Sequence, residues 1–342
     1  MEKINKNMNF LKNKSILITG GTGSFGQAFV NQVLKHHKII KKLIIFSRDE
    51  LKQFDMEQKY SLKKYPKLRY FLGDLRDKER VSRALDGVDI VVHAAALKQV
   101  PKAEYDPFEY VKTNVVGAQN LIEACLDKKV KNVIALSTDK AVSPINLYGA
   151  TKLCSDKLFL SANNIKGANK IRFSVVRYGN VLGSRGSVLP FFLKNLSKGI
   201  LPVTDINMTR FSMSILDAVN IVMWSIENNK GGEVFIPKIP SYRIMDLVKA
   251  ISQNIKVKIV GIRPGEKIDE QLITEAESLK TYDLNKYYII LGNDDPALKS
   301  FYENKKTKAI PKKFNYSSNN NKDFLTISDL KKSIKKFLIE SK

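Results

Sequence analysis

A short glycine-rich segment near the N-terminus constrains the fold of this chain more than any other feature. The sequence "TGGTGSFGQAFV" overlaps the end of the apolar run Ser15–Thr19 and opens a stretch with the spacing of a helix. Gly20, Gly23 and Gly26 recur at every third residue of it. Glycines placed in this way permit a tight turn, let backbone amides approach a pyrophosphate and let the helix pack closely on the strand. Their position between a strand and a helix predicts a dinucleotide-binding fold.

Six short apolar runs alternate with amphipathic segments over the first half of the chain. Continuous apolar strands separated by helices are typical of a parallel sheet that is covered on both faces. We therefore predict an α/β fold, with a Rossmann-type doubly wound parallel sheet over residues 12–180 and a smaller, mostly C-terminal substrate-binding region over residues 181–342. Some strands and helices of the second region are expected to return to the first. The predicted strands are Ser15–Thr19, Leu43–Phe46, Leu68–Leu72, Val88–His93, Val133–Ser137 and Ile171–Arg177.

The pattern loosens after Tyr178, where loops with Gly and Pro alternate with helical segments such as Ile215–Asn228. The stretch from about Gly292 to Asn321 is rich in Asn, Lys and Ser, and this composition predicts a loose surface excursion. A last helix is expected near Ser328–Ile339.

Composition excludes several classes of protein. Charged residues make up 27% and hydrophobic residues 43%, which is typical of a globular chain. No apolar run approaches the roughly 20 residues that a membrane-spanning helix needs. The N-terminal stretch is too polar for a signal peptide, so we expect a cytoplasmic protein without a membrane partner. Cys125 and Cys154 have no metal-binding spacing, and no metal site is expected.

The charge balance raises the question of nucleic acid. The chain has 58 basic and 34 acidic residues, a formal net charge of +24. The lysines are scattered over surface-type positions, however, without interleaved stacking aromatics. We therefore expect no nucleic acid as the main partner. A positive field of this kind also favours a small polyanionic substrate.

The segments that follow the predicted strands supply the other residues of a dinucleotide site. After the second strand, Asp49 could hold a ribose 2′-hydroxyl, as in NAD sites. Arg48, with Ser47 and Lys52 near it, could instead neutralise a 2′-phosphate. Arg48 thus favours NADP as the cofactor, and Asp49 keeps NAD open. Asp74 is expected beside the adenine, and the small residues Ala94 and Ala95 stand where the cofactor must lie close to the backbone. The predicted cofactor-binding residues are Gly20, Thr22, Gly23, Ser24, Phe25, Gly26, Ser47, Arg48, Asp49, Lys52, Asp74, Leu75, Ala94, Ala95, Thr113, Tyr148 and Lys152.

A tyrosine and a lysine follow the fifth predicted strand. Tyr148 and Lys152 are spaced i and i+4, which places them on one face of a helix. A nearby ammonium lowers the pKa of a phenol, so Tyr148 is expected to act as a base at neutral pH while Lys152 also holds the nicotinamide ribose. This pair indicates hydride transfer.

A second charged pair, Asp139 and Lys140, stands at the end of the same strand. Oxidation of a sugar C4 hydroxyl to a ketone makes the C5 hydrogen acidic, because the carbanion is an enolate. A base over C5 and an acid near the C6 hydroxyl would then expel water. A lysine whose pKa is lowered by burial in a partly cationic site can be the base, and a protonated carboxyl can be the acid.

The motifs together resemble those of a known family. The ordered set "TGGTGSFG", "SRDELKQF", "HAAALK", "LSTDKA", "NLYGATKL", "RYGNVLGSRGSV", "MTRF", "FIPKIPS" and "GIRPGEK" runs over nearly the whole chain. The chain is similar to the extended short-chain dehydrogenase/reductases, and closely to the inverting UDP-N-acetylglucosamine 4,6-dehydratases of the pseudaminic acid pathway. The resemblance implies oxidation at C4 with NADP kept on the enzyme, loss of water across C5 and C6, and return of hydride to C6. C5 is reprotonated from the opposite face, which implies a UDP-4-keto-6-deoxy sugar of L-arabino configuration.

The resemblance also implies roles for residues. Lys140 takes the role of C5 base, at a place where retaining relatives commonly have an acidic residue. Three residues depart from the family pattern and bear on acetamido preference and turnover: Gln99 and Asp269 stand where His is common, and Ser212 stands where an aromatic is common. A homo-oligomer is implied as well. The implied catalytic set is Thr138, Asp139, Lys140, Tyr148 and Lys152, and the implied substrate contacts are Lys98, Asn180, Ser187, Thr204, Arg263 and Glu266.

Two alternatives to a dehydratase remain. A UDP-sugar 4-epimerase would use the same hydride chemistry without loss of water. A non-catalytic NADP-sensing or nucleic-acid-binding protein would keep the Rossmann shell, and the intact pair of Tyr148 and Lys152 argues against it.

Overall fold

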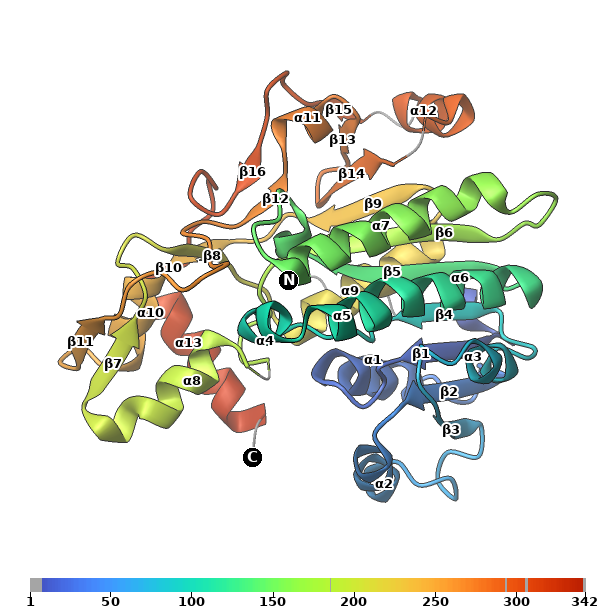
Figure 1. The fold of residues 1–342 in the computed structure, drawn as a ribbon, viewed down its shortest axis with the longest axis horizontal. Helices are drawn as coiled ribbons and strands as arrows, with labels where there is room; N and C mark the ends of the chain where they lie inside the picture. The colour runs from blue at the N-terminus through green and yellow to red at the C-terminus, as the bar shows by residue number, and fades with distance from the viewer. Residues whose placement is uncertain (1–7, 185, 293, 305–306, 341–342) are drawn as a thin grey trace.

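The computed structural model describes residues 8–184, 186–292, 294–304 and 307–340 (Figure 1). Within these ranges a ten-stranded sheet forms the centre, in the order β15-β13-β14-β9-β6-β5-β4-β1-β2-β3. The seven strands from β9 to β3 pair in parallel, and the three remaining strands add antiparallel pairs at the other edge. The strands are β1 (Ser15–Thr19), β2 (Lys42–Ser47), β3 (Leu68–Leu72), β4 (Ile90–His93), β5 (Asn132–Thr138), β6 (Arg172–Tyr178), β9 (Glu233–Pro237), β13 (Thr281–Asp283), β14 (Tyr287–Leu291) and β15 (Lys308–Ala309).

The predicted α/β fold with a doubly wound parallel sheet is confirmed. The first six strands lie where the apolar runs predict them, with ends shifted by one or two residues. The largest shift is at β4, which begins at Ile90 rather than Val88. Gly87 has a positive φ of 66° and the amide of Val88 bonds back to Leu85, so the chain is still turning there.

Helices cover both faces of the sheet because neighbouring residues of each strand point to opposite sides. In β1, Leu17 packs into a core with α3 (Lys78–Ala84), α6 (Gly117–Asp127) and α7 (Leu147–Ile165). Ile16 and Ile18 point to the other face and pack with α1 (Ser24–Leu34), α2 (Glu50–Lys59) and α9 (Ile215–Asn228). Each fully buried side chain of this size contributes about 1.5–3 kcal/mol of transfer free energy. The shorter helices of this half are α4 (Val100–Tyr105), α5 (Pro107–Tyr110) and the one-turn segments η2 (Val111–Val116) and η3 (Asp139–Ala141).

A smaller region lies beside the C-terminal ends of the parallel strands (Figure 1). Its own apolar core includes Leu189, Leu201, Leu247 and Leu330. Residues 215–237 and 281–291 of the second half return to the large sheet as α9, β9, β13 and β14. The elements of the smaller region are β7 (Ile200–Val203) paired with β11 (Lys256–Ile259), β8 (Thr209–Phe211) with β10 (Ser241–Arg243), β12 (Gln271–Ile273) with β16 (Tyr316–Ser317), and the helices α8 (Val188–Asn195), α10 (Ile244–Ile251) and α13 (Ile327–Glu340).

The expectation of a loose excursion from Gly292 to Asn321 is wrong where the stretch forms α12 (Pro296–Glu303) and the short strands β15 and β16, and residues 293, 305 and 306 lie outside the described ones. Helix α12 (Pro296–Glu303) buries Tyr302 against the large sheet, and Ser318 is fully buried beside β12. Polar composition misled the prediction here, because the few apolar residues of the segment are the ones that pack. Among the described residues, no helix combines the length and the apolar composition that crossing a bilayer requires.

Candidate active site

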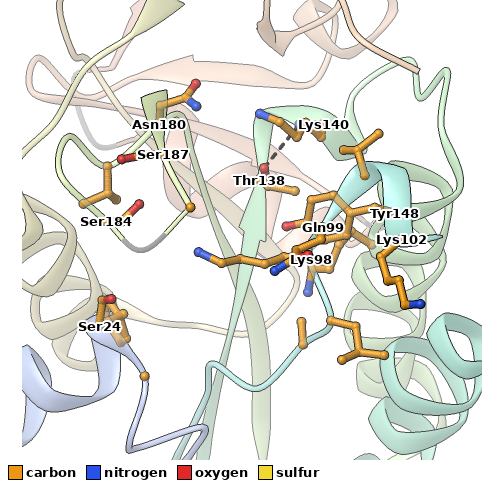
Figure 2. Close-up of a pocket in the computed structure, with 18 of the residues that line it drawn as sticks. Ser24, Lys98, Gln99, Lys102, Thr138, Lys140, Tyr148, Asn180, Ser184 and Ser187 are labelled. Atoms are coloured by element: carbon orange, nitrogen blue, oxygen red, sulfur yellow. Dashed lines mark hydrogen bonds between the residues drawn. The ribbon is translucent and has the colours of Figure 1, made fainter. Parts of the chain in front are cut away.

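One large cleft lies between the C-terminal ends of the parallel strands and the smaller region. Its volume is about 1510 Å³, and all the residues predicted from the sequence for cofactor, catalysis and substrate line it. Figure 2 shows three groups of residues around the cleft. Ser24 lies at the lower left, Asn180, Ser184 and Ser187 lie above it, and Lys140 and Tyr148 lie on the right. The cleft thus brings together residues from both halves of the chain.

The glycine-rich turn fits a dinucleotide. Gly20 has a positive φ of 66°, and a Cβ there would lie 2.9 Å from the Cα of Ala95. The turn can therefore pass close to the backbone after β4 only with glycine at this position. Helix α1 begins at Ser24 and presents its N-terminal amides to the cleft. These are the features with which a helix N-terminus receives a pyrophosphate.

The end of β2 carries the residues that bear on the choice between NADP and NAD. Asp49 caps α2, where its Oδ1 accepts the backbone amide of Lys52 at 3.0 Å, and it also pairs with the Lys52 ammonium. These hydrogen bonds from Lys52 lower the pKa of Asp49. Arg48 lines the cleft with 52% of its side chain exposed and lies 3.8 Å from Asp74. Asp49 is thus engaged within the protein, whereas Arg48 faces the cleft.

Helix α7 carries Tyr148 and Lys152 on its buried face. The helix begins after Asn146, whose side chain accepts the amide of Gly149 at 2.8 Å. A Cβ at Gly149 would overlap the carbonyl oxygen of Lys140, so glycine at this position lets η3 approach α7. The close approach brings Lys140 and Tyr148 to the same part of the cleft.

Burial controls the ionisation of Tyr148 and Lys152. It raises the pKa of Tyr148 to about 12, although the Lys140 ammonium and a hydrogen bond with Thr138 lower it. The expected lowering of this pKa is wrong, because loss of hydration outweighs both groups. Burial lowers the pKa of Lys152, and the Asp156 carboxylate opposes that effect only in part. Asp156 is itself buried one turn further along α7, where its Oδ2 accepts the Ser137 hydroxyl at 2.5 Å.

The second pair, Asp139 and Lys140, lies in η3 at the end of β5. Lys140 Nζ is 3.0 Å from Asp139 Oδ1 and 3.1 Å from Glu270 Oε1. Thr138 donates its hydroxyl to the same Asp139 oxygen at 2.9 Å. Burial lowers the pKa of Lys140, but the two carboxylates together outweigh it and raise that pKa above its ordinary value. The expectation of a lowered pKa at Lys140 is therefore wrong.

Two carboxylate oxygens of this cluster are buried without a hydrogen-bond partner among the described residues. They are Asp139 Oδ2 and Glu270 Oε2. Asp139 is 1% exposed and Glu270 is 3% exposed, and both line the cleft. Burial raises the pKa of Glu270, and the Lys140 ammonium opposes that shift. An unpartnered buried oxygen is costly, so the cluster is prepared for a proton or for a donor from a ligand.

The substrate side of the cleft is polar. Arg263 pairs with Glu266 through two hydrogen bonds of 3.0 and 2.9 Å. Asn180 Oδ1 and Ser187 Oγ are buried and have no hydrogen-bond partner among the described residues. Burial lowers the pKa of Lys98, and Lys140 acts in the same direction. Thr204 lines the same part of the cleft.

The three departures from the family pattern have different surroundings. Asp269 accepts the Thr209 hydroxyl at 2.6 Å and the Asn319 amide at 2.9 Å, so it ties β8 to the segment after β16. Ser212 is buried and borders a small void beside Asn180. Gln99 lines the cleft at the start of α4.

Three further residues of the cleft have no assigned role from the sequence: Arg210, Lys267 and Glu270. Arg210 is buried and donates to the carbonyl oxygens of Ile268 at 2.6 Å and Lys267 at 2.9 Å. It therefore fixes the segment that carries Glu270 against β8. Arg210 lies in the motif "MTRF", Lys267 ends the motif "GIRPGEK", and Glu270 follows three residues later. The motifs could therefore have drawn attention to these residues, but nothing in the sequence shows that the two motifs meet at Lys140.

A glycine turn for a dinucleotide, followed by a buried Tyr and Lys on one helix face at the ends of parallel strands, defines the class of the extended short-chain dehydrogenase/reductases. Across the described ranges, no group of three or more His, Cys, Asp or Glu residues is placed to hold a metal ion. The polysaccharide biosynthesis protein family matches residues 16–291, and the chain belongs to that family.

Individual relatives agree with this assignment. A UDP-N-acetylglucosamine 4,6-dehydratase (inverting) of Campylobacter jejuni, serotype O:2, is 53% identical over 317 residues, which cover 90% of this chain and 93% of that protein. A UDP-glucose 4-epimerase of Rickettsia canadensis is 43% identical over 307 residues, covering 87% and 89%. The X-ray structure of Pen from Bacillus thuringiensis has a TM-score of 0.88 and 37% identity, and covers 96% of this chain and 99% of that one.

Proposed function

We propose that the chain is a C5-inverting UDP-N-acetylglucosamine 4,6-dehydratase, a hydro-lyase. The observation that carries the proposal is the meeting of two pairs of ionisable residues in one cleft, Tyr148 with Lys152 and Asp139 with Lys140. The first pair suits hydride transfer at C4, and the second suits removal of water across C5 and C6. Similarity to the Campylobacter dehydratase over most of the chain supports the same reaction.

The first pair handles the C4 hydroxyl. When bound, NADP would supply the hydride acceptor for C4 and the hydride donor for C6. Tyr148 takes the proton of the C4 hydroxyl, and Lys152 holds the nicotinamide ribose. The Lys140 ammonium and Thr138 lower the pKa of Tyr148 against the effect of burial, which is the direction that this step needs.

The second pair handles C5 and C6. Once C4 is a ketone, a neutral Lys140 takes the C5 proton, and a protonated Asp139 gives its proton to the departing C6 hydroxyl. Asp139 lines the cleft, and its Oδ2, which has no partner among the described residues, is the oxygen proposed to carry that proton. C5 then takes a solvent proton from the opposite face, which completes the inversion, and Tyr148 releases the C4 proton to solvent.

NADP is the proposed cofactor, and NAD is the weaker candidate. Asp49, which would hold a free 2′-hydroxyl, is already paired with Lys52, and Arg48 is exposed to the cleft. A guanidinium suits a 2′-phosphate because it binds phosphate oxygens through paired hydrogen bonds.

The UDP part of the substrate is proposed to bind on the side of Arg263 and Glu266, with Lys98, Asn180, Ser187 and Thr204 around the sugar and diphosphate. Net charge of +24 also favours a dianionic substrate. The product is proposed to serve pseudaminic acid or related surface-glycan synthesis. The protein itself is proposed to be a cytoplasmic homo-oligomer.

The test is incubation of the purified protein with UDP-N-acetylglucosamine and NADP in deuterated water. The expected product is a keto sugar that has lost one water and gained one deuterium, with NMR placing the deuterium at an inverted C5. Unchanged mass with an inverted C4 would establish the epimerase instead. Steeply salt-dependent nucleic-acid binding without sugar chemistry would support the non-catalytic alternative.

A further inference from the structure

Glu270 lies on the far side of Lys140 from Asp139, so that one ammonium is held between two carboxylates. The distances from Nζ are 3.0 Å to Asp139 and 3.1 Å to Glu270. Glu270 comes from the segment just before β12, and its backbone is fixed by Ser318. The Ser318 amide donates to the Glu270 carbonyl at 2.8 Å, and the Glu270 amide donates to the Ser318 hydroxyl at 3.0 Å. The contact is therefore built from both backbone and side chain.

The proposed reaction creates a charge problem that a single carboxylate cannot solve. Lys140 has to be neutral to take the C5 proton, and Asp139 has to carry a proton for the C6 hydroxyl. If Asp139 alone faced the ammonium, it would be ionised as the counter-ion and could not serve as an acid. A second carboxylate removes this conflict because it can carry the negative charge.

Glu270 has other cations near it besides Lys140. Arg210 from β8 and Lys267 from the preceding loop are the other cations that act on Glu270, in addition to Lys140, while Asp139 is the facing acid. Asp139 uses Oδ1 to accept Thr138 and Lys140, and its Oδ2 has no partner among the described residues. Glu270 Oε2 is likewise buried without a partner among the described residues, so each carboxyl has one oxygen that can hold a proton.

We propose that Glu270 is the counter-ion and the proton acceptor of Lys140, which leaves Asp139 free to hold the proton that the leaving hydroxyl needs. Glu270 is a positioning residue, since it acts through Lys140 and not on the sugar. This inference rests on the proposed dehydratase function.

The protons balance within the cluster. Before elimination, the Lys140 ammonium gives one proton to the Glu270 carboxylate and becomes an amine. The amine takes the C5 proton, and Asp139 gives its proton to the C6 hydroxyl, which leaves as water while the C5–C6 double bond forms. The cluster then holds an ammonium, an ionised Asp139 and a protonated Glu270. Transfer of a proton from Glu270 through Lys140 to Asp139 restores the starting state. The raised pKa of Glu270 fits its part as a temporary acceptor.

The experiment compares two steps in the full-length enzyme loaded with NADP. C4 oxidation is followed by the nicotinamide absorbance after addition of UDP-N-acetylglucosamine, and water loss by the mass of the sugar. In Glu270→Gln we expect water loss to fall about 100-fold while C4 oxidation stays within about threefold, so that a 4-keto hexose accumulates. The matched control is Glu227→Gln, the same substitution at an exposed residue of α9 outside the cleft, and it should leave the ratio of the two steps unchanged.

Equal loss of both steps in Glu270→Gln, or normal water loss, would overturn the proposal. If that variant does not fold, as judged by thermal unfolding, Glu270→Asp keeps the charge but draws it back by one methylene, and the same selective loss of water elimination is expected. Equal effects on the two steps there would also overturn it. A wild-type enzyme that never releases water would instead refute the proposed function, so the two failures are distinguishable.

Discussion

Two lysines of the same cleft, Lys140 in η3 and Lys152 in α7, show opposite pKa shifts. Burial lowers the pKa of both. At Lys152 one carboxylate, Asp156, opposes burial and the pKa stays below its ordinary value. At Lys140 the carboxylates of Asp139 and Glu270 act together and the pKa rises. Two carboxylates face Lys140 and one faces Lys152, which accounts for the opposite directions of the two pKa shifts.

The difference separates two kinds of work. In the proposed mechanism Lys152 stays positive, and the single buried carboxylate of Asp156 favours its charged form. Lys140 would gain and lose a proton in each turnover, and two carboxylates within 3.1 Å of its Nζ can accept that proton. A lysine with a raised pKa can therefore be a base when an acceptor is in direct contact with it.

Removal of the Tyr148 hydroxyl is expected to have the largest effect. Tyr148→Phe deletes the group that takes the C4 proton, so both C4 oxidation and water loss should fall by about 10³-fold or more. Exchange of the C4 hydrogen and the mass of the product measure the two steps. Persistent water loss in this variant would show that elimination does not depend on prior oxidation, which would break the division between the two pairs.

Replacement of Lys140 should impair the loss of water and not the oxidation at C4. In Lys140→Ala we expect water loss to stop, with a decrease of about 10³-fold, while some exchange of the C4 hydrogen persists. The reason is that the first pair on α7 remains in place. NMR and mass spectrometry of the sugar recovered from deuterated water give both readings. Equal loss of the two signals would contradict separate roles for Lys140 and Lys152.

Asp156→Asn tests the other side of the comparison. Asp156 raises the pKa of Lys152 against burial, so its neutralisation should lower that pKa further. Because the charged form of a lysine is lost as pH rises through its pKa, the alkaline limb of the kcat profile should move to lower pH. Asp55→Asn, on the exposed face of α2, is the matched control and should leave the profile unmoved. A profile that does not shift would mean that Asp156 serves only the Ser137 hydrogen bond.

The cofactor side of the site could be predicted from the sequence because each of its residues follows directly on its own strand. Gly20, Arg48 and Ala94 come just after β1, β2 and β4, and parallel strands bring their C-terminal ends to one edge. Local order along the chain is then enough to place them together. Tyr148 and Lys152 could be placed for a similar reason, since helical spacing alone puts them on one face.

The contact between Lys140 and Glu270 could not be predicted in this way. It depends on how the segment before β12 crosses from the smaller region to the end of β5, and on Arg210 and Ser318, which hold that segment. The predicted directions of the pKa shifts of Tyr148 and Lys140 are wrong because they depend on the folded surroundings. At Tyr148 burial raises the pKa, and at Lys140 the carboxylate of Glu270, which is distant in the sequence, adds to that of Asp139.

The smallest effect is expected at the ribose end of the cofactor site, where the charges are exposed. Arg48→Ala should weaken NADP binding about fivefold and leave NAD binding nearly unchanged, since an exposed charge pair is worth roughly 1 kcal/mol. The matched variant Lys52→Ala frees Asp49 from its ion pair and should strengthen NAD binding instead. Dissociation constants for the two dinucleotides, measured by calorimetry at fixed salt, test both variants. Equal weakening of NADP and NAD by Arg48→Ala would show that the guanidinium recognises the shared adenosine or pyrophosphate and not the 2′-phosphate.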